Sequence, residues 1–296
     1  MRSSLLAIAC LALPVAFAFA AVAASAAEPK PSAEPKPTGE PKPAVELVAH
    51  RGESYDAPEN TLDAYKLAWD RGVPAAELDV HLTKDGKLIL IHDADTKRTT
   101  GGAANLVVKE HAADELRKLD VGSWKSPQYA GERMPLLDEA LATVPPGRRM
   151  FIEVKVGPEA VPELVRCVER SGKSPEQLPV ISFNLDTCRE AKKALPKHKV
   201  YFLSSFKQDK QTKKWGPTVE ELIAKAKAAN LDGLDVQSKE PTVVDAAFAK
   251  AVRDAKLALL VWTVDDPALA KKMVDLGVDG ITTNRGQWMA EQLAGK

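Results

Sequence analysis

The chain has 296 residues, 45% of them hydrophobic, and its 41 basic side chains are balanced by 41 acidic ones. This balance excludes the strongly basic composition with which many proteins bind nucleic acids, so no nucleic-acid partner is expected. From Val45 onward about 250 residues remain, which is enough for one large α/β domain.

The first 26 residues have the pattern of a secretory signal peptide. Arg2 precedes an apolar run from Leu5 to Ala24, and Ala24-Ser25-Ala26 fits the small-residue cleavage pattern. A transmembrane anchor is the competing interpretation, because the run reaches the ~20 residues that a span needs. The run contains Pro14 and ends in a cleavage site, so we expect residues 1–26 to be removed. The mature protein would then be periplasmic or extracellular, with no stable membrane insertion.

Residues 27–44 form a charged, proline-rich segment. Glu-Pro-Lys-Pro occurs three times, beginning at Glu28, Glu34 and Glu40. Such a composition cannot build a hydrophobic core, and it is typical of an extended, disordered spacer. We therefore place a single domain at residues 45–296 and expect no second domain boundary.

Strand and helix patterns alternate along this domain. The expected strands are residues 46–49, 76–82, 150–156, 179–183, 200–204, 233–236, 258–264 and 280–283. The expected helices are residues 62–71, 137–143, 160–170, 185–194, 219–229, 243–255 and 267–276, followed by a final helix. Asn60 or Thr61 can cap the first of them. Eight such units predict a parallel sheet closed into a TIM (β/α)8 barrel, with its site on the loops that follow the strands.

A small insertion is expected after the second strand. Residues 84–87, Lys-Asp-Gly-Lys, are a turn signal, and the apolar run from Leu88 to Ile91 returns as the second arm of a hairpin. Residues 99–132 then form a long excursion with a helical piece at residues 114–119. Loops of this length in compact domains are usually functional or disordered.

Three carboxylates are expected at neighbouring strand ends. Glu77 and Asp79 alternate with apolar residues and therefore share one face of their strand, and Glu153 ends the next barrel strand. For a carboxylate pair alone, a solvated strand face is the competing interpretation. With Glu153 the group becomes an all-oxygen site suited to Ca²⁺ or Mg²⁺. Zinc is less expected, because neither Cys167 nor Cys188 lies at a strand end.

Two histidines are placed for proton transfer. His50 ends the first strand and His92 follows the hairpin, and imidazole titrates near neutral pH. The other histidines have weaker cases: His81 could share a face with Asp79, whereas His111 and His198 are expected on the surface. The two mature cysteines lie in helical patterns, and we expect them to be packed and unpaired.

Four further residues are candidates for substrate binding. Arg51 and Lys155 supply positive charge suited to a phosphate. Trp262, at the end of the seventh strand, could form an apolar wall, although core packing is the default for tryptophan. Glu59 lies in the loop after the first strand, where a ligand could reach it.

Together these motifs resemble the glycerophosphodiester phosphodiesterase family. They are His50-Arg51-Gly52, Pro58-Glu59-Asn60-Thr61, Glu77-Leu78-Asp79-Val80, Thr83-Lys84-Asp85-Gly86, His92-Asp93, Glu153-Val154-Lys155 and Trp262-Thr263-Val264. The similarity spans nearly all of residues 45–287. It implies a TIM barrel that hydrolyses glycerophosphodiesters, with a divalent cation on Glu77, Asp79 and Glu153. It also implies a catalytic pair of His50 and His92, Arg51 and Lys155 on the phosphate, and an insertion that helps to cover the site.

Two positions depart from the family pattern. Asp265 stands where many relatives carry Asn, and Asn284-Arg285-Gly286 replaces the usual Asp-x-Pro after the last strand. Both are expected near the rim of the barrel, where they would bear on substrate preference.

The expected reaction cleaves a small glycerophosphodiester to sn-glycerol 3-phosphate and an alcohol. One alternative is a lipid phosphodiesterase of the lysophospholipase D or sphingomyelinase D kind, which would need a long apolar groove. The insertion offers Leu106, Val107, Val108 and Trp124 but no continuous apolar stretch. The other alternative is a catalytically silent binding protein on the same barrel, which the presence of every ionisable position argues against.

Overall fold

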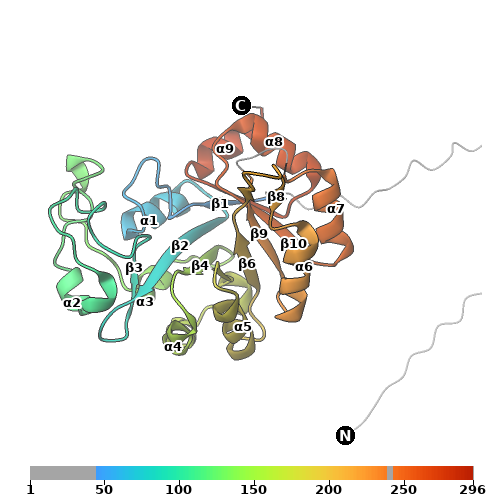
Figure 1. Ribbon diagram of the computed structural model, residues 1–296. Coiled ribbons are helices and arrows are strands. Elements are labelled where there is room, and N and C mark those ends of the chain that lie inside the picture. The colour runs from blue at the N-terminus through green and yellow to red at the C-terminus, as the bar shows by residue number, and fades with distance from the viewer. Residues whose placement is uncertain (1–44, 239–242, 296) are drawn as a thin grey trace, which may run out of the picture. The chain divides into compact units, whose positions relative to one another are not determined.

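Eight parallel strands close into a barrel within the part of the chain that the computed structural model describes, residues 45–238 and 243–295 (Figure 1). They are β1 (Glu46–Ala49), β2 (Ala75–Leu82), β4 (Arg149–Val154), β5 (Val180–Ser182), β6 (Val200–Ser204), β9 (Gly233–Gln237), β10 (Ala258–Trp262) and β11 (Gly280–Thr283). The barrel closes because β1 pairs with β11 on one side and with β2 on the other. This confirms the predicted TIM barrel. The predicted signal peptide and spacer lie outside the described residues.

Helices connect the strands and cover the barrel. They are α1 (Leu62–Asp70), α3 (Leu137–Ala142), α4 (Val161–Ser171), α5 (Leu185–Ala194), α6 (Val219–Ala228), α7 (Ala246–Asp254), α8 (Pro267–Leu276) and α9 (Gly286–Leu293). Thr61 caps α1, since its hydroxyl accepts a hydrogen bond from the Ala64 N–H. Helix α7 begins later than predicted because the Asp245 carboxylate caps it, accepting a hydrogen bond from the Phe248 N–H.

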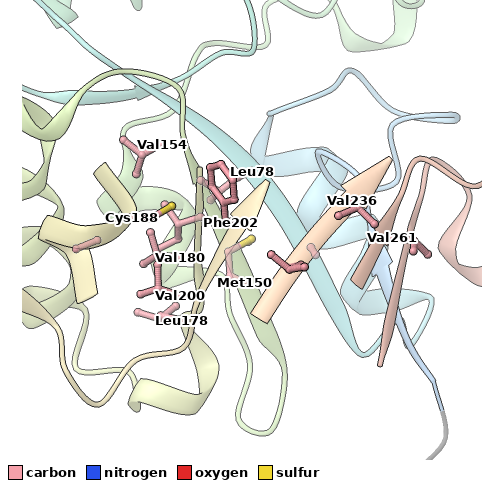
Figure 2. Close-up of a cluster of buried hydrophobic side chains, with 14 of the residues drawn as sticks. Leu78, Met150, Val154, Leu178, Val180, Cys188, Val200, Phe202, Val236 and Val261 are labelled. Carbon is pink, nitrogen blue, oxygen red and sulfur yellow. The ribbon is translucent and has the colours of Figure 1, made fainter. Parts of the chain in front are cut away.

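The alternation of side chains along the strands divides the core into two clusters. Outward residues such as Leu78, Val180 and Val236 pack against the helices and form the main core (Figure 2). Inward residues form a second cluster that fills the barrel: Val48, Ala75, Phe151, Ile181, Tyr201, Leu203 and Leu260. Glu153 lies two residues after Phe151 on β4, so it also points into the barrel, one layer nearer the carboxyl ends of the strands.

The insertion after the second barrel strand is present as predicted. Strand β3 (Leu88–Leu90) pairs antiparallel with β2, and the following segment, in green in Figure 1, contains η1 (Val108–Glu110), α2 (Ala113–Leu116) and η2 (Pro127–Tyr129). It has a small core of its own, made of Ile89, Ile91, Val108, Leu116, Val121 and Met134. The lysine-rich loop at 207–214 carries a short hairpin that was not predicted, with strands β7 (Lys207–Gln208) and β8 (Trp215–Gly216).

Two sequence expectations about isolated residues have different outcomes. Cys167 and Cys188 are both buried free thiols, as expected. The prediction of a surface position for His198 is wrong, because this residue is only 7% exposed. It lies in the α5–β6 connection, where its N–H donates to the Leu195 carbonyl and its own carbonyl accepts from Lys192 Nζ.

In the described part of the chain, no helix combines the length and the apolar character that crossing a bilayer requires.

Candidate active site

The three predicted carboxylates meet at the carboxyl ends of β2 and β4. Asp79 and Glu153 are register partners in the two strands, and Glu77 lies one inward position before Asp79. Each residue offers an oxygen within 4.8 Å of the others, and all three are buried. Burial and the charges of Asp79 and Glu153 raise the pKa of Glu77 well above its ordinary value. Burial and Asp79 likewise raise the pKa of Glu153 to about 7.

Two cations compensate this triad in part. Lys155 Nζ lies 2.7 Å from Glu153 Oε1 and 3.3 Å from Asp79 Oδ1, and Arg51 Nε lies 3.1 Å from Asp79 Oδ2. Although burial acts in the opposite direction, these cations lower the pKa of Asp79. Glu77 Oε1 and Asp79 Oδ1 still accept no hydrogen bond from any described residue. Three carboxylates against two cations, with oxygens left unsatisfied, fit a hard divalent cation.

A second acidic group, on helices α3 and α4, differs from the triad because arginines pair with its carboxylates. Asp138, Glu163 and Cys167 also bring ligand atoms together. Here Glu163 Oε2 accepts from Arg166 Nε at 2.6 Å, and Asp138 Oδ2 accepts from Arg170 Nη2 at 2.8 Å. Because arginines satisfy these carboxylates, we interpret the group as an ion-pair network that stabilises the contact between α3 and α4.

The loop after β1 holds Asp79 from the other side. Asn60 adopts a left-handed conformation with φ of 58°, which Asn tolerates better than most residues. Its Nδ2 donates to Asp79 Oδ2 at 2.8 Å, and its Oδ1 accepts from the Asp79 N–H at 3.1 Å. Asn60 therefore orients a triad residue, and the helix cap falls to Thr61 alone. Gly52 lets this loop pass over α1, because a Cβ there would lie 2.6 Å from Ala64 Cβ.

His50 is held by a short chain of hydrogen bonds to the last strand. Its Nδ1 lies 2.7 Å from Asn284 Oδ1, and Asn284 Nδ2 donates to Asp265 Oδ2 at 2.5 Å. Since an ionised carboxylate only accepts, Asn284 must turn its amino group to Asp265 and its oxygen to His50. His50 Nδ1 then carries the proton, and Nε2 is left as an acceptor. Burial and the charge of Arg51 lower the pKa of His50 to about 4. Asn284 and Asp265, the two positions that depart from the family pattern, thus form the hydrogen-bond chain that supports His50, a candidate catalytic residue.

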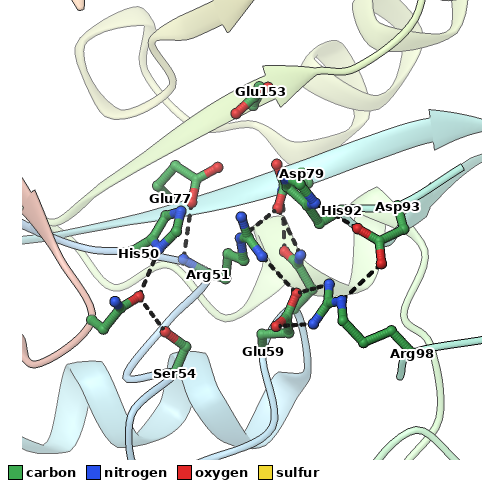
Figure 3. A network of polar contacts seen from close by, with 12 residues as sticks. His50, Arg51, Ser54, Glu59, Glu77, Asp79, His92, Asp93, Arg98 and Glu153 are labelled. Carbon is green, nitrogen blue, oxygen red and sulfur yellow. Dashed lines mark hydrogen bonds and ion pairs between the residues drawn. The ribbon is translucent and has the colours of Figure 1, made fainter. Parts of the chain in front are cut away.

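His92 has a charged support instead (Figure 3). Its Nδ1 lies 2.8 Å from Asp93 Oδ1, and Asp93 Oδ2 accepts from Arg98 Nε at 2.8 Å. Arg98 also donates twice to Glu59, which accepts from Arg51 Nη1 at 2.8 Å. Glu59, predicted to bind substrate, is thus engaged by two arginines and lies behind Arg51. Burial lowers the pKa of His92 below its ordinary value, although the charge of Asp79 and the hydrogen bond to Asp93 act in the opposite direction.

A cavity of about 140 Å³ joins these groups. Its lining includes His50, Arg51, Glu77, His92, Glu153 and Lys155, together with Ile181, Phe183, Leu203, Asp235, Trp262, Thr263 and Thr282. The Trp262 ring packs edge-on against Phe183 at a centroid distance of 5.5 Å, so it forms a wall of the cavity as the sequence suggested. The weaker candidate His81 is absent from the lining, and its Nε2 lies 3.1 Å from the His92 carbonyl oxygen.

Four residues of this site were not predicted from the sequence as site residues: Asn60, Asp93, Arg98 and Asp235. Asn60 and Asp93 lie inside the family motifs found in the sequence. Those motifs mark the positions but do not indicate that the side chains contact Asp79 and His92. Arg98 reaches the site only through the fold of the insertion. Asp235 follows an apolar residue on a barrel strand with the same alternation as Glu77, and that alternation could have identified it.

The barrel and its mouth, with acidic, basic and imidazole groups around one cavity, define a TIM-barrel phosphodiester hydrolase. Residues 50–287 match the model of the glycerophosphoryl diester phosphodiesterase family. The chain is 33% identical over 245 residues to a glycerophosphodiester phosphodiesterase of Caldanaerobacter subterraneus, with 80% of this chain and 93% of the relative covered. It is 31% identical over 261 residues to that of Bacillus subtilis, with 80% and 82% covered.

A solved structure agrees with these relatives. A phosphodiesterase of Oleispira antarctica, in complex with the product sn-glycerol-3-phosphate, superimposes with a TM-score of 0.74 at 25% identity, covering 85% of this chain and 97% of that one. The chain belongs to the glycerophosphodiester phosphodiesterase family, which confirms the resemblance seen in the sequence and makes it an enzyme of this hydrolase class.

Proposed function

We propose that this enzyme is exported, requires a divalent cation, and hydrolyses small glycerophosphodiesters to sn-glycerol 3-phosphate and an alcohol with His50 and His92 as its acid-base pair. The observation that carries the proposal is the carboxylate triad of Glu77, Asp79 and Glu153, in which Glu77 Oε1 and Asp79 Oδ1 have no hydrogen-bond partner among the described residues. Glu77 and Glu153 line one cavity together with both histidines. The product bound to the Oleispira antarctica relative supports the substrate class.

Glu77, Asp79 and Glu153 would hold Ca²⁺ or Mg²⁺, their oxygens being the ligands these ions prefer. When bound, such an ion supplies Lewis-acid stabilisation of charge on the phosphoryl oxygens. Arg51 and Lys155 line the same cavity and remain charged, because nearby carboxylates raise the pKa of each despite burial. They would bind the phosphate oxygens and orient the ester.

The different supports of the two histidines favour different roles. His50 is backed by the neutral amide of Asn284, and its lowered pKa keeps Nε2 unprotonated at neutral pH. Burial lowers the pKa of His92 as well, but His92 is the histidine of the pair that has a carboxylate, Asp93, on its Nδ1, and this carboxylate stabilises the imidazolium form. We therefore assign His50 as the base that removes a proton from the nucleophile and His92 as the acid that protonates the leaving alcohol.

The nucleophile would be the 2-hydroxyl of the substrate's own glycerol. Within the described chain, no Ser, Thr or Cys side chain hydrogen-bonds to His50 or His92. A tethered hydroxyl gains a large effective molarity. It would attack phosphorus as His50 takes its proton, and the alcohol would leave with the proton of His92. Water would then open the cyclic phosphate with the roles reversed.

Two measurements test this function. Glycerophosphocholine should be hydrolysed with added Ca²⁺ or Mg²⁺, and the activity should disappear after chelation and return with the ion. The phosphocholine ester of 1-propanol, which lacks the 2-hydroxyl, should react far more slowly, and phosphorus NMR should detect the cyclic phosphate with the natural substrate. Equal kcat for the two esters would show that external water attacks directly.

The lining of the site favours the water-soluble substrate over the lipid alternative. The cavity of about 140 Å³ suits a polyol phosphate, and the hollow of about 410 Å³ that shares Glu153, Lys155 and Phe183 with it is otherwise lined by Val154, Ser182 and Asn184. This mixed lining is not the long apolar groove that a lysophospholipid chain would need. Export is tested by N-terminal sequencing of the protein recovered from the periplasm or medium of an expressing bacterium. The mature chain should begin at Ala27, and a retained N-terminal segment would contradict cleavage.

A further inference from the structure

Asp235 is a buried acid for which the proposed reaction has no role. It lies on β9 and is 2% exposed, and its Oδ1 accepts no hydrogen bond from a described residue. Within the described chain, its carboxyl group also has no ion-pair partner among the Arg, Lys and His side chains. Burying an unpartnered carboxyl group is costly, so the fold alone gains nothing from an acid here.

The position of Asp235 relates it to the cavity. The side chain is part of the same lining as the histidines, but β9 lies four strands from β2 in either direction around the barrel. Asp235 therefore lies across the mouth from the carboxylate triad, and it is not a member of that cluster. Its neighbours are Leu203, its register partner on β6, and Trp262, whose Nε1 donates to the Asp235 carbonyl oxygen at 3.2 Å.

The hydrogen-bonding capacity of the Asp235 side chain favours a hydroxyl group as its partner. Burial and the charge of Glu153 raise the pKa of Asp235 to about 8, so at neutral pH the group is a neutral acid that can both donate and accept. A hydroxyl group also both donates and accepts. A quaternary ammonium group would offer no donor to Oδ1 and would require the ionised form.

We propose that Asp235 binds the terminal hydroxyl of the glycerol moiety and thereby selects glycerol esters over esters of simpler diols. This inference rests on the proposed function of the same site. The depth of Asp235 favours glycerol, because a three-carbon polyol fits a small cavity while the variable alcohol extends outward. The substrate would supply the hydrogen bond that the fold leaves unmade.

The test combines two substrates with matched variants. Glycerophosphocholine is compared with the phosphocholine ester of 1,2-propanediol, which keeps the adjacent hydroxyl and lacks only the terminal one. The wild-type enzyme should prefer the glycerol ester in kcat/KM by roughly 10- to 100-fold, as expected when a buried polar group loses its partner. Asp235→Leu should bring the ratio close to one, whereas Asp235→Asn, which still donates and accepts, should keep most of it.

Ser238→Ala is the control, because Ser238 is also buried, its hydroxyl has no hydrogen-bond partner among the described residues, and it is not part of the cavity lining. It should leave the preference unchanged. Folding of Asp235→Leu is checked by its thermal midpoint, which should not fall, since an unpaired polar group has been removed.

A preference in Asp235→Leu equal to that of the wild type would overturn the proposal, and so would a larger loss in Ser238→Ala. Calorimetric binding of sn-glycerol 3-phosphate and 1,2-propanediol 1-phosphate, with Ca²⁺ present, gives a readout independent of turnover. If the wild type hydrolyses neither ester, the proposed function fails. The two binding constants then decide the role of Asp235 separately, because equal constants in the wild type would exclude the contact.

Discussion

Glu153→Gln should stabilise the metal-free enzyme. The ordinary pKa of this carboxyl is 4.5, and burial with Asp79 raises the pKa of Glu153 to about 7 in the fold. Keeping Glu153 ionised at pH 8 without a bound ion therefore costs roughly 3 kcal/mol. Gln has nearly the same shape and no charge, and Lys155 keeps Asp79 as a partner at 3.3 Å. The variant should thus recover much of this cost.

The pH dependence follows from the direction of the shift. Because the folded-state pKa of Glu153 lies above the unfolded value, its stabilising contribution is complete below pH 4.5 and is lost as the pH rises through about 7. His50 acts in the opposite sense, since its pKa is lowered to about 4 and stability is lost as the pH falls from 6.5. Comparing variant with wild type at each pH cancels the His50 contribution and isolates Glu153.

The assay is thermal unfolding from pH 5 to pH 8 with EDTA, then with Ca²⁺ or Mg²⁺. At pH 8 the metal-free variant should melt roughly 5–10 °C above the wild type, and the difference should vanish near pH 5. Added ion should raise the midpoint of the wild type, and far less that of the variant. Glu163→Gln is the matched control: it breaks the pairing with Arg166, so it should lower the midpoint at every pH without changing the response to the ion.

Two results would refute this reasoning. One is a metal-free Glu153→Gln protein that is less stable than wild type at pH 8, because the carboxylate would then be a structural requirement rather than a cost. The other is a wild-type midpoint that neither Ca²⁺ nor Mg²⁺ raises. Either outcome would remove the physical basis for the cation site on Glu77, Asp79 and Glu153.

The remaining predictions concern the histidines. His50→Ala and His92→Ala should each lower kcat by ~10²-fold or more, and the double variant should resemble the worse single one, because cooperating residues are not additive; near-normal kcat in a single variant would remove that histidine from the mechanism. Asn284→Asp should raise the pKa of His50 and move the acidic limb of the kcat/KM profile to higher pH. The new carboxylate would face Asp265, so the double variant Asn284→Asp/Asp265→Asn should relieve the repulsion between the two carboxylates and restore stability. An unmoved acidic limb would show that Asn284 does not control His50.

The fold was predictable because each unit of the barrel has a local signal. Strand β2 reads as alternating acidic and apolar residues, and helices α5 and α8 lie within their predicted bounds because Asn184 and Asp266 cap them. The errors lie where a local signal was overlooked or weak. The helical pattern predicts Asp245 inside a helix, whereas this residue caps helix α7, and the two-residue strands of the hairpin after β6 are too short to show a period.

The site was predictable only in part. Strand alternation brings Glu77, Asp79 and Glu153 together, because it fixes the direction of side chains at strand ends. The supports of the histidines come from loops whose paths no local pattern reports. Asn284 is 234 residues from His50 in the chain, and the sequence marked it only as a departure from the family pattern.

Unsatisfied polar atoms separate function from fold in this chain. Among the described acidic side chains, the buried oxygens without a hydrogen-bond partner belong to Glu77, Asp79 and Asp235, and all three lie on strands that form the mouth. Glu163, which is 5% exposed, is paired with arginine. Glu77 Oε1 and Asp235 Oδ1, as buried oxygens without a partner among the described residues, each cost ~1–3 kcal/mol, whereas Arg51 and Lys155 offset part of the cost of burying Asp79. A cation and a polar ester can supply the missing partners, so the groups that weaken the empty barrel are those that give it affinity.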